Sequence, residues 1–203
     1  MEEWKESLAI IRRIQFFKRE QRSIYCREMF LEMDGEYWSG NREAEAEHND
    51  FITAVLQSDV DAMNEYMNRI SMEMFRYFDI GKKSYENDPE RFYHGFVLGL
   101  FVELKDRYYI TSNRESGLGR YDIVMEPKKE ELPAIIIEFK VFNKRKEKDL
   151  EETVASALAQ IEEKQYEKEL LVRGIAKDRI RKYGFAFLGK EVFIGESKKE
   201  ERI

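Results

Sequence analysis

Residues 119–140 carry the sequence GRYDIVMEPKKEELPAIIIEFK, in which two apolar runs flank a polar connection. Both runs are rich in β-branched side chains, and they predict strands at 121–126 and 134–142 joined through a hairpin-type connection. Charged side chains are unusual in such runs, because burying an unpaired charge costs several kcal/mol. Asp122, Glu138 and Lys140 therefore need partners or a chemical role.

The alternation of side chains along a strand places these charges. Glu138 and Lys140 share one face with Ile136, about 6–7 Å apart along the strand. The opposite face carries Ile135, Ile137, Phe139 and Val141. If the two strands pair antiparallel, Asp122 lies near Glu138 on the same face, and two such carboxylates repel unless a cation sits between them. Oxygen ligands of this kind select Mg²⁺ or Mn²⁺, which keep open positions for a phosphate.

A lysine beside such a cation completes the requirements for phosphodiester hydrolysis. Its ammonium group can orient the attacking water and offset charge on a phosphoryl group, while the metal lowers the pKa of that water. A simpler interpretation is also open, in which Glu138 and Lys140 form an edge-strand ion pair and Asp122 only begins a strand. The pattern alone supports both.

Composition narrows the class of protein. The chain has 203 residues, a length that favours a single main domain. Its formal net charge of −6 argues against a protein that coats nucleic acid through general electrostatic attraction. A local basic patch is still allowed. Two basic clusters occur: Lys140, Lys144, Arg145, Lys146 and Lys148, and then Arg173, Lys177, Arg179, Arg181 and Lys182.

Several functional classes are excluded by what the sequence lacks. It contains no apolar run long enough to span a bilayer and no signal-peptide pattern, so a cytoplasmic location without a membrane partner is expected. Cys26 is the only cysteine, which excludes internal disulfides and cysteine-rich zinc sites. The phosphate-binding patterns GxxxxGK[ST] and GxGxxG are absent, which excludes a P-loop enzyme.

Hydrophobic periodicity predicts helices followed by an α-β-β-β-α-β-β order, which is an α/β (α+β) fold. We expect an N-terminal helical segment over 1–48 and a domain over 49–203, with a helical lead-in at 50–80 and a core at 88–195. The expected helices are 3–33, one from the Ser58-Asp59 cap to about 78, one from Pro89 to about 104, and 149–170. The remaining expected strands are 108–111, 183–188 and 191–194, with a loop at 112–119 and a turn at Gly189-Lys190.

Asp122 and Glu138-Phe139-Lys140 in this element order resemble the PD-(D/E)xK nuclease superfamily. The resemblance implies a restriction-endonuclease-like core with a mixed central sheet flanked by helices. The resemblance covers residues 90–194. Four segments are similar to a bacterial branch found C-terminal to an ATPase-like region: FYHGF at 92–96, SNRESGLGRYD at 112–122, IIEFK at 136–140 and YGFAF at 183–187. In this chain about 50 residues of helix and acidic connection stand in place of that region.

The resemblance implies a role for each matching position. Asp122 and Glu138 would bind the metal, with the Phe139 carbonyl as a further ligand, and Lys140 would be the catalytic lysine. His94 matches the metal-binding histidine of RecB-type relatives, although a buried histidine satisfied by hydrogen bonds is also compatible with its apolar helix. Gln160 matches a catalytic glutamine, and Tyr166 is the nearest candidate for the tyrosine of the same motif, as a substrate contact. These relatives space the pair as QxxxY, whereas Gln160 and Tyr166 are six residues apart.

The loop before Asp122 offers further charged side chains. Arg114 and Arg120 can bind a substrate phosphate, and Glu115 can ligate a second metal. The alternatives are a loop-fixing ion pair and a solvated arginine.

Two hypotheses of different classes follow. The first is a hydrolase, a Mg²⁺- or Mn²⁺-dependent nuclease acting on nucleic acid, with DNA as the expected substrate. The second is a nucleic-acid-binding or oligomerisation module on the same fold whose cleavage activity is weak or lost. A homodimer through the N-terminal helices is compatible with both, with Leu8, Ile11, Phe17 and Phe30 in the contact.

Overall fold

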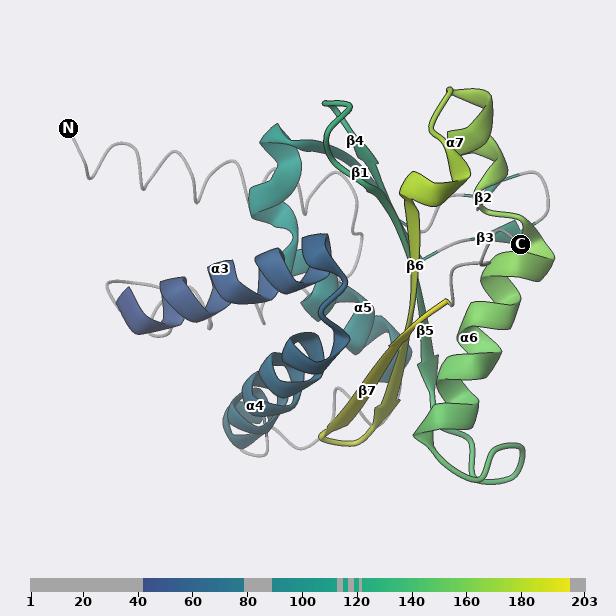
Figure 1. Ribbon diagram of the computed structural model, residues 1–203. Coiled ribbons are helices and arrows are strands. Elements are labelled where there is room, and N and C mark those ends of the chain that lie inside the picture. The colour runs from purple at the N-terminus through teal and green to yellow at the C-terminus, as the bar shows by residue number, and fades with distance from the viewer. Residues whose placement is uncertain (1–41, 79–88, 113–114, 117–118, 121, 198–203) are drawn as a thin grey trace.

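A mixed five-stranded sheet with helices on both faces forms the centre of the computed structural model, which describes residues 42–78, 89–112, 115–116, 119–120 and 122–197 (Figure 1). The helices α3, α4 and α5 cover one face, and α6 and α7 cover the other (Figure 1). Two hydrophobic clusters fill the spaces between these layers. The predicted fold class is confirmed.

The sheet has the order β1-β4-β5-β6-β7. Its strands are β1 (Tyr108–Ser112), β4 (Ile123–Pro127), β5 (Ala134–Val141), β6 (Ile180–Leu188) and β7 (Glu191–Glu196). Neighbouring strands are antiparallel except β5 and β6, which are parallel and are connected through α6. The region expected as a loop between β1 and β4 also contains a two-stranded ladder, β2 (Glu115–Ser116) with β3 (Gly119–Arg120).

The predicted alternation of faces along β5 is confirmed. Ile135, Ile137 and Phe139 pack in the cluster that includes α3, α4 and α5. Ile136 packs in the cluster with residues of α6 and α7. Glu138, two residues after Ile136, therefore lies on the α6 side of the sheet.

The first described helices are α3 (Arg42–Gln57), α4 (Val60–Phe78) and α5 (Pro89–Leu100), and a short 3₁₀ helix η1 (Val102–Asp106) follows them. The cap predicted before α4 is present, since Asp59 Oδ1 accepts a hydrogen bond from the Ala62 amide at 3.0 Å. The expected boundary at residue 48 falls inside α3, and Phe51 of this helix stacks on Tyr66 of α4 at 4.6 Å between ring centroids. The helix expected at 3–33, with its predicted dimer contacts, lies outside the described residues.

Three polar side chains of α4 bind the outer backbone of the edge strand β7 and of the turn that precedes it. Asn64 accepts from the Ile194 amide at 2.8 Å and donates to the Ile194 carbonyl at 3.0 Å. Asn68 makes the same pair of bonds with Val192, at 3.0 and 2.7 Å. Ser71 donates to the Lys190 carbonyl at 2.9 Å. The spacing of the two asparagines along α4 matches the spacing of their partners along β7. Four residues of a helix rise about 6 Å, and two residues of a strand rise about 6.8 Å.

The single helix expected at 149–170 is wrong, since the chain forms α6 (Leu150–Lys164) and α7 (Lys168–Val172). Gln165 between them is left-handed, with φ 54° and ψ 43°. The Gln165 amide bonds to the Glu162 carbonyl at 3.1 Å and the Tyr166 amide to the Ile161 carbonyl at 3.3 Å, the pattern of a Schellman motif. In an unbroken helix Tyr166 would lie about 140° around from the buried Ile161. The turn brings Tyr166 into the same apolar cluster instead.

Candidate active site

Glu138 and Lys140 of β5 are joined through one side chain of α6. Gln160 donates through Nε2 to Glu138 Oε1, and its Oε1 accepts from Lys140 Nζ at 2.8 Å. Glu138 is only 3% exposed, so this amide contact lies in a largely dry environment. Strand β5 places Glu138 and Lys140 on one face of the sheet, and α6 supplies the Gln160 amide that hydrogen-bonds to both.

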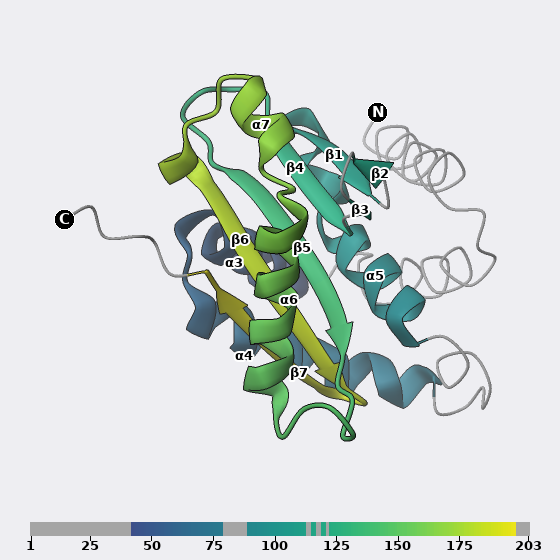
Figure 2. The same cartoon turned by 90° about the vertical axis from the view of Figure 1, so that its right-hand side faces the viewer.

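Glycine residues of the neighbouring strands let α6 lie close to the sheet at this point. Gly184 of β6 is the register partner of Glu138. A Cβ atom at Gly184 would lie 2.9 Å from the Val154 carbonyl oxygen and 3.1 Å from the Ala157 Cβ atom. A Cβ atom at Gly195 of β7 would lie 2.7 Å from Val154 Cγ1. The helix therefore passes directly over the strand next to Glu138, as Figure 2 shows for α6 across β5 and β6.

Asp122 directly precedes β4, which neighbours β5 on the edge opposite β6. The register of β4 with β5 has Ile123 opposite Ile137, and its continuation brings Asp122 to the level of Glu138. Asp122 Oδ2 accepts from the Phe139 amide at 2.8 Å. The amide and carbonyl of one strand residue point to the same side, so the Phe139 carbonyl, the predicted further metal ligand, also faces the Asp122 side.

His94 of α5 holds the backbone of Asp122. Its Nε2 lies 3.2 Å from the Asp122 carbonyl oxygen and 3.0 Å from Ser112 Oγ. We assign the proton to Nε2, because a carbonyl oxygen can only accept. His94 would have to give up this contact before Nε2 could ligate a metal, so its metal role stays a prediction. Ser112 is a contact that sequence reasoning missed, since a serine at a strand end gives no distinct signal.

Tyr166 joins the site although its spacing from Gln160 differs from the QxxxY pattern. The Schellman turn at Gln165 folds it back, so that it is 2% exposed and its phenol bonds to Gln160. Burial raises the pKa of Tyr166, the charges of Glu138 and Asp122 raise it further, and the bond with Gln160 opposes them. Both carboxylates therefore lie close enough to act on one phenol. The predicted substrate contact of Tyr166 is untested.

The comparison with protein families agrees with this geometry. Residues 88–197, more than half of the chain, match the family model of the PD-(D/E)XK nuclease superfamily. The chain belongs to this superfamily. Neither the comparison with curated proteins nor that with solved structures found a match.

The superfamily match begins next to α5 and leaves α3 and α4 outside it. These two helices nevertheless share a hydrophobic cluster with the matched sheet. They are therefore packed as part of the nuclease-like core. None of the helices in the described ranges is both long and apolar enough to cross a bilayer.

The loop residues predicted to contact substrate can be placed only in part. The backbones of Glu115 and Arg120 pair across β2 and β3. Arg114 lies outside the described residues. The predicted phosphate and second-metal roles of these three residues stay predictions.

The site offers oxygen ligands for a metal typical of the superfamily. Across the described parts of the chain, no three or more His, Cys, Asp or Glu side chains gather closely enough to hold a metal. The residues that could hold one are the predicted ligands, the carboxylates of Asp122 and Glu138 and the carbonyl of Phe139. This set fits Mg²⁺, which proteins often bind through one or two carboxylates, with waters and substrate phosphate completing the shell.

Proposed function

We propose that this protein is a divalent-metal-dependent nuclease that hydrolyses DNA phosphodiester bonds. The observation that carries the proposal is that Gln160 of α6 binds both Glu138 and Lys140 of β5, while Asp122 accepts from the amide of Phe139 between them. Membership of the PD-(D/E)XK nuclease superfamily supports it. We also propose, from the resemblance of the four segments described above, that the chain belongs to the bacterial branch of that superfamily.

The proposed reaction is the attack of a water oxygen on phosphorus while the bond to the leaving sugar oxygen breaks and that oxygen takes a proton. Bound Mg²⁺ or Mn²⁺ would supply a more acidic water and a polarised phosphate. Asp122, Glu138 and the Phe139 carbonyl would hold the cation. Lys140, oriented by Gln160, would offset the negative charge that develops on the phosphoryl oxygens.

Cleavage of linear and circular DNA by the full chain with and without Mg²⁺ or Mn²⁺ tests the proposal. We expect metal-dependent cleavage that Asp122→Asn and Lys140→Met each abolish. The matched controls are Asp178→Asn and Lys129→Met, which change the same residue types at exposed positions away from the site and should retain activity. Circular dichroism of each variant establishes that it is folded.

A thermal melt with Mn²⁺ separates loss of metal from loss of chemistry. The cation should raise the melting temperature of the wild type and of Lys140→Met, but not of Asp122→Asn, because only the last variant loses a ligand. DNA binding without turnover by a wild type that binds Mn²⁺ would contradict the proposal and favour the binding module instead.

A further inference from the structure

Two basic clusters stand out in the sequence, and the structure separates them by the partners of their side chains. Most of the second cluster is used inside the fold. Arg173 pairs with Glu126, Arg179 donates to the Leu132 carbonyl at 2.8 Å, and Arg181 donates to the Val55 carbonyl at 3.4 Å. Lys182, at 7% exposed, pairs with Glu162 at 2.7 Å and also with Glu167. These cations already have protein partners.

After Lys140, the remaining cations of the first cluster lie in the loop 143–148 between β5 and α6. Lys144, Arg145 and Lys146 are exposed, and within the described ranges none of them forms an ion pair. Hydrogen bonds between residues close in the sequence hold the backbone of the loop. Asn143 Oδ1 accepts from the Arg145 amide at 3.1 Å, and the Asn143 carbonyl accepts from the Lys146 amide at 2.8 Å.

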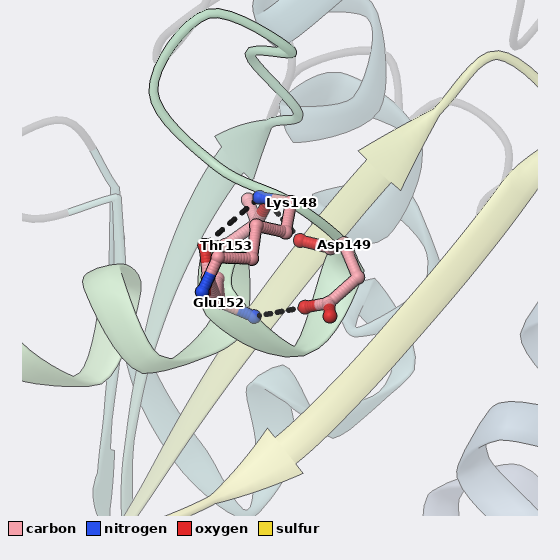
Figure 3. A network of polar contacts seen from close by, with 4 residues as sticks. All are labelled: Lys148, Asp149, Glu152 and Thr153. Carbon is pink, nitrogen blue, oxygen red and sulfur yellow. Dashed lines mark hydrogen bonds and ion pairs between the residues drawn. The ribbon is translucent and has the colours of Figure 1, made fainter.

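The acidic side chains around this loop are occupied by the turn and by the start of α6. Glu147 Oε2 accepts from the Asn143 amide and from Thr153 Oγ1, both at 2.9 Å. Figure 3 shows that Asp149 caps the Glu152 amide, and that Glu152 binds both the amide and the ammonium group of Lys148. The loop therefore presents three cations that these carboxylates do not pair.

The position of the loop relates it to the proposed active site. Lys144 follows Lys140 by four residues, so their Cα atoms are at most about 14 Å apart, and Lys146 is at most about 22 Å away. Duplex DNA rises about 3.4 Å per base pair, so these distances correspond to about four to six base pairs. A molecule with a net charge of −6 needs such a local patch to hold a polyanion.

We propose that Lys144, Arg145 and Lys146 bind the phosphate backbone of duplex DNA beside the scissile phosphate. This inference rests on the proposed function, because it takes DNA as the substrate. The contacts are to phosphates alone, so they should raise affinity without setting sequence preference. They should also make binding depend on salt, since each phosphate contact contributes about 0.9 to the slope of log affinity against log salt concentration.

Fluorescence anisotropy of a labelled duplex with the full chain over 50–200 mM salt tests this proposal. The triple variant Lys144→Gln/Arg145→Gln/Lys146→Gln should lower the salt slope by about 2.7, so that its affinity falls about 40-fold less than that of the wild type over this range. The control is Arg107→Gln/Lys129→Gln/Lys168→Gln, which removes the same charge from exposed positions. Arg107 and Lys129 lie beside the paired ends of β1 and β4, and Lys168 begins α7. Figure 2 shows α7 at the opposite end of the sheet from the β5–α6 loop.

Equal slopes for the two triple variants would overturn the proposal. The readout does not depend on turnover, so failure of the loop and failure of the nuclease are distinguishable. Cleavage that requires Asp122, with no change of slope in the loop variant, would leave the nuclease proposal standing without the loop. DNA binding that depends on the loop, with no cleavage, would support the loop proposal and contradict the nuclease proposal.

Discussion

Gln160 is the side chain on which the arrangement of charges depends. Its amide donates to one oxygen of Glu138 and accepts from Lys140, and it also meets the phenol of Tyr166. A neutral group with both a donor and an acceptor can serve a carboxylate and an ammonium together. An aliphatic side chain of similar shape can serve neither.

We predict that Gln160→Leu lowers metal-dependent cleavage about 10–100-fold, the usual effect of removing a group that orients the ligands of a metal. The variant should also lose about 1–3 kcal/mol of unfolding free energy, because the buried Glu138 loses a donor. Cleavage assays and urea unfolding measure the two effects. Gln57→Leu, an exposed change at the end of α3, should alter neither. Unchanged cleavage by Gln160→Leu would show that the amide has no part in the reaction.

Tyr108 gives a prediction for alkaline pH. It is 1% exposed, burial raises its pKa to about 12, and its hydroxyl has no hydrogen-bond partner among the described residues. The folded protein keeps this proton between about pH 10 and 12 while the unfolded chain releases it. The raised pKa of Tyr108 therefore contributes to the unfolding free energy. That contribution is complete below pH 10 and is lost as the pH rises from about 10 to 12.

Tyr108→Phe should remove that part of the alkaline sensitivity and change stability by less than about 1 kcal/mol at pH 8, since no bond is lost. Guanidinium unfolding from pH 8 to 12 measures the difference from the wild type. The neighbouring Tyr109 is 61% exposed, so Tyr109→Phe should follow the wild-type curve. The same alkaline loss in Tyr108→Phe and wild type would contradict the assignment.

At the scale of elements, the closeness of α6 to the sheet determines whether Gln160 reaches Glu138. We predict that Gly184→Ala destabilises the protein by about 1–3 kcal/mol, because the new methyl group meets the Val154 carbonyl and Ala157. The displaced helix should also reduce cleavage. Ser156→Ala, on the exposed side of α6, adds no bulk at the contact and should change neither. Full cleavage activity in a destabilised Gly184→Ala variant would contradict the prediction, because it would show that catalysis does not depend on the position of α6.

The elements that the sequence predicted well are those determined by local patterns. Alternation along 134–142 was enough to put Glu138 and Lys140 on one face, and the short connection at 127–133 was enough to bring Asp122 beside them. The break at Gln165 could not be predicted, because glutamine is not a typical left-handed residue and the bulk of Tyr166 decides the turn only once the apolar cluster exists. The spacing of Gln160 and Tyr166 was therefore misleading on its own.

At the scale of the whole molecule, α4 covers the edge strand β7, and α3 packs against α4. Met63 and Met67 of α4 lie one helical turn apart and are both buried in the core, as helical periodicity indicates. Asn64 and Asn68 gave no such signal, because polar residues at helical spacing usually face water. Their role depends on a strand more than 120 residues later in the chain.

We predict that Asn64→Ala and Asn68→Ala each cost about 1–3 kcal/mol of unfolding free energy, because each removes two hydrogen bonds to the backbone of β7. The double variant should also self-associate, since it leaves the outer backbone of an edge strand unpaired. Urea unfolding and light scattering measure these effects. Asn49→Ala, at an exposed position of α3, is the matched control. A monomeric double variant of wild-type stability would show that the amides are dispensable.

The amide ladder between α4 and β7 also has a kinetic consequence. Backbone protons on the outer side of a terminal strand normally exchange with deuterium through small local openings. The protons of Val192 and Ile194 are instead held by side chains of a helix that is itself anchored in the core. They should therefore exchange only when α4 separates from the sheet, which makes their exchange rates a direct measure of how tightly the segment outside the superfamily match is attached.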